Sequence, residues 1–135
     1  MRLLAGGAIG GHVVLLACVL WFAVTGGRPA AVWALLAGLV TIVFFTIGQG
    51  IQVLVAEADP KVVLGASLAS FTLRAGGLGA LLAWSVDNSA RIPSLDPVAI
   101  AVTAIAVVVG WLAAEIWVFT KLRVPIYDPP SDQRE

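Results

Sequence analysis

Apolar residues dominate four long segments of the chain, and short polar breaks separate these segments. They cover about residues 3–25, 31–55, 62–84 and 97–120. A helix needs about 20 apolar residues to cross roughly 30 Å of hydrocarbon. The pattern therefore predicts an all-α membrane protein: a bundle of four transmembrane helices within residues 1–121, followed by a polar tail over residues 122–135.

The polar breaks contain residues typical of turns and helix starts. Residues 26–29 include two glycines and a proline, and residues 57–61 include Asp59-Pro60. Asp96 precedes Pro97, which is the order expected of an N-cap and the first helical residue. We therefore expect two tight turns and one longer loop over residues 85–96.

The composition agrees with residence in a lipid bilayer. Apolar residues make up 60% of the chain and charged residues only 12%. The net charge is zero, so no overall field attracts nucleic acid. The chain has one cysteine and one histidine, too few for an internal disulfide or a Cys/His zinc site. We expect no metal and no cofactor.

Basic residues indicate how the bundle is oriented, because short loops rich in Lys and Arg tend to stay in the cytoplasm. If the N-terminus is cytoplasmic, only Arg28 and Arg91 face the outside. The cytoplasmic side then holds the larger set of basic residues, namely Arg2, Lys61, Lys121, Arg123 and Arg134. The bias predicts that both ends of the chain are cytoplasmic.

Two ionisable residues fall inside the apolar segments, where a central Arg costs about 2.5 to 3.5 kcal/mol on insertion scales. Arg74 lies about 18 Å of helix rise from the predicted cytoplasmic end of its segment, and Glu115 about 9 Å from the same end. Helical side chains lean toward their own N-terminus, so the two lean toward each other. We therefore predict an ion pair between Arg74 and Glu115, either direct or through a water or an amide.

Further polar residues share the same half of the predicted bundle. Gln49 and Gln52 come from the second segment and His12 from the first. In the third segment, Ser70 shares a helical face with Arg74. The predicted intramembrane cluster thus comprises Arg74, Glu115, Gln49, Gln52, His12 and Ser70. It either only joins the helices by hydrogen bonds or also contacts a partner or solute.

Small residues predict surfaces where helix backbones approach closely. Gly6, Gly7, Gly10 and Gly11 form two overlapping small-xxx-small pairs, and Gly77 lies on the same face as Arg74. Such surfaces serve either packing within this chain or docking onto another glycine-rich helix, including a second copy of the chain.

Catalysis has little support in the sequence. No nucleophile and base stand in a recognisable pattern, and Glu115 is the only acid within an apolar segment. We expect the chain not to be an enzyme.

The C-terminal third resembles the corresponding part of actinobacterial ATP synthase protein I homologues. The resemblance rests on Leu95-Asp96-Pro97-Val98-Ala99-Ile100, on Val109-Gly110-Trp111, and on the stretch over residues 116–129, in which Trp117 precedes the basic pair Lys121 and Arg123 and a terminal Tyr127-Asp128-Pro129. The four-segment layout and an Arg followed by Gly77-Leu78-Gly79 are also similar.

This resemblance implies a multi-pass protein of the bacterial inner membrane that is encoded beside the rotary ATP synthase. Such a protein assists assembly or stability of the c-subunit ring, and a role in magnesium supply has also been proposed for the family. Subunit c would be the partner, with Arg74 and the glycine faces as contacts. The family supplies no established binding residues.

A second interpretation is a small transporter or flippase that moves a cation or a small amphipathic solute. Four-helix multidrug exporters depend on an acidic residue in the first span. Here the first segment contains His12 and no acid, which weakens this analogy.

Overall fold

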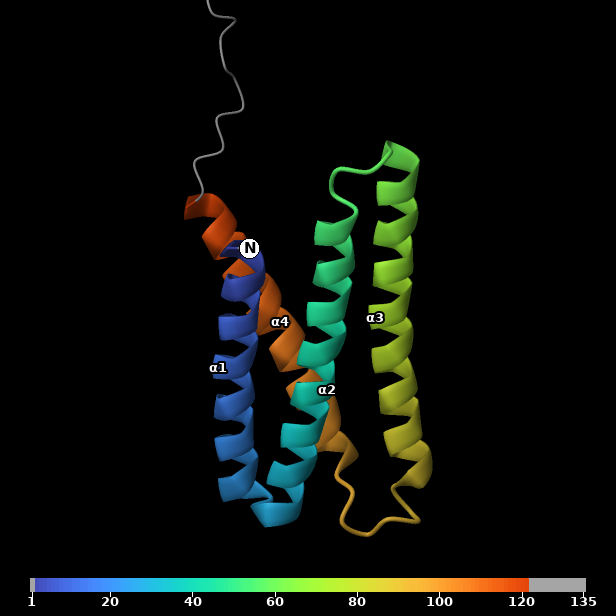
Figure 1. Cartoon of the computed structure of the whole chain (residues 1–135). Helices are drawn as coiled ribbons and strands as arrows, with labels where there is room; N and C mark the ends of the chain where they lie inside the picture. The colour runs from blue at the N-terminus through green and yellow to red at the C-terminus, as the bar shows by residue number, and fades with distance from the viewer. Residues whose placement is uncertain (1, 122–135) are drawn as a thin grey trace, which may run out of the picture.

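Four α-helices connected by short turns make up the described part of the chain, residues 2–121 of a computed structural model (Figure 1). They are α1 (Arg2–Thr25), α2 (Gly27–Leu54), α3 (Pro60–Asn88) and α4 (Pro97–Lys121). All four are long and apolar enough to cross a membrane. The predicted four-helix architecture is therefore confirmed, whereas the predicted tail over residues 122–135 lies outside the described residues.

The helix boundaries follow from local chemistry at the turns. Gly27 has a φ of +73°, a left-handed conformation that favours glycine and lets the chain reverse at once, so α2 begins there rather than at about residue 31. The Asp59 carboxylate accepts a hydrogen bond of 2.9 Å from the Lys61 backbone N–H and caps α3. The Asp96 side chain caps α4 in the same way through the backbone N–H of Ala99.

The third helix ends at Asn88, beyond the predicted limit of residue 84, so the last loop covers only residues 89–96. This loop and the α1–α2 turn lie at one end of the bundle, which we call the Arg91 end. The α2–α3 turn, the start of α1 and the end of α4 lie at the opposite end, which we call the Lys61 end (Figure 1).

The packed core lies among α1, α2 and α4. Its central cluster consists of Leu15, Ile42, Phe45, Val107 and Trp111. The backbones of α1 and α4 approach closely, since a Cβ atom on Gly10 would lie only 2.7 Å from the Gly110 carbonyl oxygen. In Figure 1, α4 crosses behind α2, with its C-terminal half beside α1 and its N-terminal half toward α3.

By contrast, α3 packs mainly against α2 and is exposed along most of its length. Within Pro60–Asn88 only two residues are buried, the polar Ser70 and Ser85. Large apolar side chains such as Leu64, Leu68 and Phe71 point outward. Outward apolar side chains also cover α1 and α4, which suits contact with lipid and a multi-pass membrane protein.

Candidate functional site

Arg74 enters the bundle from α3 and lies against α2. Its guanidinium carbon is 4.7 Å from the centre of the Phe45 ring, within the range of a cation–π interaction. Its Nη2 atom is 3.5 Å from the Phe45 carbonyl oxygen. The Nε atom is buried and has no hydrogen-bond acceptor among the described residues. Arg74 is therefore held against α2 with one buried nitrogen, Nε, left unpaired within the described residues.

Gly48 makes room for this arrangement. A side chain at this position would collide with Nε of Arg74 and with the Ser70 hydroxyl. Ser70, one turn before Arg74 on α3, donates a hydrogen bond of 3.2 Å to the Gly48 carbonyl oxygen. The predicted placement of Ser70 and Arg74 on one inward face of α3 thus describes the contact between α3 and α2.

Glu115 on α4 is held by two donors. Trp111, one turn earlier on α4, donates its indole N–H to Oε1 of Glu115 over 2.8 Å. The Gln49 side-chain amide donates a hydrogen bond to the same oxygen. The second carboxylate oxygen, Oε2, accepts no hydrogen bond from any residue that the structure describes.

Arg74 and Glu115 form no direct ion pair within residues 2–121, which corrects the predicted direct contact. The reason is the path of α4, which packs mainly against α1 and little against α3, the helix that carries Arg74 (Figure 1). Each charged group contacts an aromatic ring instead: Phe45 lies under the guanidinium, and Trp111, whose ring centre is 5.7 Å from that of Phe45, donates to Glu115. The amide predicted as a bridge is present at Glu115, in Gln49.

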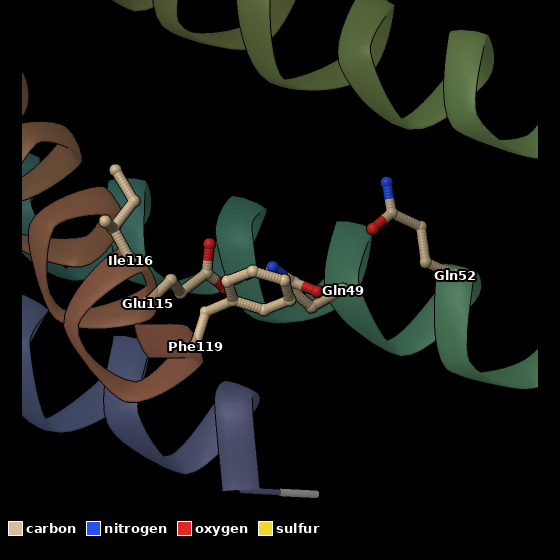
Figure 2. A pocket seen from close by; sticks show the side chains of 5 residues that line it. All are labelled: Gln49, Gln52, Glu115, Ile116 and Phe119. Atoms are coloured by element: carbon tan, nitrogen blue, oxygen red, sulfur yellow. Dashed lines mark hydrogen bonds between the residues drawn. The ribbon is translucent and has the colours of Figure 1, made fainter. Parts of the chain in front are cut away.

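A pocket of about 340 Å³ opens beside Glu115, between α2 and α4. Gln49, Gln52, Glu115, Ile116 and Phe119 line it (Figure 2). Figure 2 shows the Gln49 side chain directed at Glu115, with Gln52 farther along α2. The pocket therefore combines a carboxylate, two amides and two apolar walls.

His12 does not join the cluster, which corrects that part of the prediction. Its side chain is exposed on the outer face of α1, and its Nδ1 atom is 2.7 Å from the Ala8 carbonyl oxygen one turn earlier. The depth of His12 along α1 was compatible with the cluster, but the inward face of α1 is formed by other residues, namely Gly7, Gly11, Leu15 and Phe22.

The predicted packing glycines lie against side chains of this chain. Gly6 faces Val118, Gly7 and Gly11 face Trp111, and Gly10 faces Ala114 and Gly110 on α4. Gly77 on α3 faces the Phe44 ring on α2. These surfaces serve packing within the chain, the simpler of the two interpretations offered by the sequence.

Phe45 and Trp111 belong to the site, although the sequence analysis did not place either of them in the polar cluster. For Trp111 a signal was available: it precedes Glu115 by four residues on one helix, a spacing that brings two side chains together. Phe45 carried no such signal, because one phenylalanine among many apolar residues of a segment looks like any other.

The cluster offers hydrogen-bond donors, acceptors and one carboxylate in an apolar setting, which suits binding. Comparison with protein-family models, curated proteins and solved structures finds no match.

Proposed function

We propose that this chain is an accessory membrane protein of the F-type ATP synthase in a bacterial inner membrane, where it assists assembly or stability of the c-subunit ring. The observation that carries the proposal is Arg74, a half-buried cation in the middle of the least buried helix, with a single hydrogen bond within the described residues. The resemblance of the C-terminal third to ATP synthase protein I homologues supplies the partner.

The chemistry of subunit c suits such a contact. It is a glycine-rich helical hairpin with a buried carboxyl group, as the family resemblance implies. A half-buried guanidinium that makes one hydrogen bond within the described residues could also hydrogen-bond that carboxyl group before the ring closes. Transient shielding of an intramembrane acid would stabilise single subunits on their way into the ring.

The outer face of α3 adds a surface for a neighbouring helix. Gly65, Gly76 and Gly79 have open space where a Cβ atom would stand. Small residues allow helix backbones to approach closely in a membrane, where such packing drives association. This exposed face lies on the side of α3 away from Arg74, and it gives a neighbouring helix a second surface on the same helix.

The proposal is tested by purifying the tagged chain in a mild detergent and probing for subunit c. We expect the wild-type chain and Arg91→Gln, a matched control in the exposed last loop, to recover subunit c. Arg74→Gln should recover much less. If no subunit c is recovered and a deletion strain assembles c-rings in normal yield, the proposal is contradicted.

We further propose that both ends of the chain are cytoplasmic, because the Lys61 end carries the excess of basic residues. The test uses single cysteines in a Cys18→Ser background. Ser94→Cys, in the exposed loop of the Arg91 end, should react with a membrane-impermeant maleimide in intact cells. Ala58→Cys, in the turn at the opposite end, should react only after permeabilisation. The reverse pattern would contradict this orientation.

A further inference from the structure

Only one of the two carboxylate oxygens of Glu115 accepts hydrogen bonds from the described residues. Both protein donors, Trp111 and Gln49, meet Oε1. Oε2 has no donor among the residues described, and the carboxylate borders the pocket between α2 and α4. An acid in an apolar segment is costly unless its charge is paired. The geometry therefore leaves an acceptor open toward a space that another molecule can enter.

Among the described residues, no basic side chain forms a hydrogen bond or a salt bridge with this acid. Arg74 is engaged by the Phe45 ring and the Phe45 carbonyl oxygen. Lys121, six residues after Glu115, has its Nζ atom 6.0 Å from the centre of the Trp117 ring and is exposed. A carboxylate with one oxygen free of protein donors matches a cationic ligand that carries N–H donors of its own.

The other residues that line the pocket indicate which kind of cation would bind there. Gln49 uses its amide nitrogen for Glu115, which leaves its carbonyl oxygen free, and Gln52 adds a second amide at the rim (Figure 2). Carbonyl and carboxylate oxygens suit a primary ammonium, which has three N–H donors. Ile116 and Phe119 add an apolar wall to the same pocket, suited to an alkyl chain.

We propose that this pocket binds the primary ammonium group of a membrane-dissolved amphiphile, with Glu115 as its counter-ion. The charged head meets Oε2 of Glu115, and the apolar part lies along Ile116 and Phe119. The ammonium group could belong to an aminophospholipid or to a free long-chain amine. This proposal does not depend on an association with the ATP synthase.

The test measures equilibrium binding of radiolabelled dodecylammonium to the purified full chain in phosphatidylcholine nanodiscs. Glu115→Gln keeps an oxygen for the Trp111 and Gln49 donors, so the variant should fold. It should bind the probe roughly tenfold more weakly or worse, because a charge-assisted hydrogen bond is lost. Asp87→Asn removes an exposed acid of α3 near the Arg91 end and should bind as the wild type does.

A neutral probe makes the test independent of any variant. Dodecanol has a similar chain without the charge and should bind the wild type much more weakly than dodecylammonium. Equal binding of the two probes, or equal affinity of wild type and Glu115→Gln for dodecylammonium, would overturn the proposal.

The source of the ligand follows from native mass spectrometry of the chain purified from mixed phosphatidylethanolamine and phosphatidylcholine vesicles. Selective retention of phosphatidylethanolamine by the wild type, and its loss in Glu115→Gln, would assign the site to a lipid headgroup. Binding of dodecylammonium without lipid retention would assign it to a free amphiphile.

Discussion

Trp111 is a single residue that contributes contacts to both the core and the candidate site. Its side chain is fully buried, packs against Phe45, Gly7 and Gly11, and donates to Glu115. It is thus both the largest side chain of the central core and the donor that orients the carboxylate. Core packing and the polar cluster are joined in this one residue.

Replacing Trp111 with Phe should separate the hydrogen bond from most of the packing. We expect the free energy of unfolding to fall by about 1–3 kcal/mol, from the lost N–H donor and a small cavity. Trp117→Phe, on the exposed face of the same helix, should change it by no more than about 0.5 kcal/mol. Reversible unfolding in detergent micelles measures both. Equal effects of the two substitutions would show that the indole N–H and its burial add nothing.

The sequence could predict which polar residues lie inside the membrane but only partly how they meet. Arg74, Ser70, Gln49 and Glu115 stand out because polar groups are rare in apolar segments, and the structure places all four at helix contacts. His12 met the same criterion, yet it faces outward. The depth of a residue in the membrane follows from its position along the helix. The direction in which its side chain points, inward or outward, depends on which side of that helix the other helices cover.

The distance between helices α1 and α4 depends on glycines. Gly10 and Gly110 face each other across this contact: a Cβ on Gly10 would lie 2.7 Å from the Gly110 carbonyl oxygen, and one on Gly110 would lie 3.4 Å from the Gly10 carbonyl oxygen. On α3, Gly76 has nothing near the corresponding position. The two kinds of glycine look alike in the sequence and differ entirely in their surroundings.

Substituting Gly10 with Ala should therefore push α1 away from α4. Overpacking of this kind typically costs about 1–3 kcal/mol, so the melting temperature should fall. Gly76→Ala should leave it unchanged or raise it slightly, because Ala favours the helix over Gly by up to about 1 kcal/mol. Thermal unfolding of both variants, followed by circular dichroism, compares them directly. A similar melting temperature for the two would contradict the close approach.

Hydropathy located the four helices well and their ends less well. The pattern measures the apolar span, whereas α3 continues past it through the largely polar residues 85–88 and ends at Asn88. The start of α2 depends on the left-handed Gly27, which makes the turn shorter than the polar residues suggested. Asp59 and Asp96, whose capping role has a clear local signature, mark the starts of α3 and α4.

The arrangement of the helices in the whole molecule could not be predicted from the sequence. A pattern of apolar segments does not say that α4 crosses α2 diagonally or that α3 packs mainly against α2. This crossing separates Arg74 from Glu115, although their depths in the membrane and the directions of their side chains favoured an ion pair. Helices α1, α2 and α4 form the packed body, and α3 is attached along one side.

The one-sided attachment of α3 also bears on how the chain enters the bilayer during synthesis. Among the four helices α3 is the least apolar, and its central Arg74 finds its ring and carbonyl partner on α2, the helix made just before it. A lone arginine at mid-span opposes insertion by about 2.5–3.5 kcal/mol. Glycosylation-tagged α3 should consequently integrate poorly into microsomes alone and efficiently when α2 precedes it, whereas Arg74→Leu should integrate in either context. Equal integration of wild-type α3 with and without α2 would mean that the translocon accepts the arginine unaided. Integration that depends on α2 would mean that α2 and α3 leave the translocon together as a hairpin.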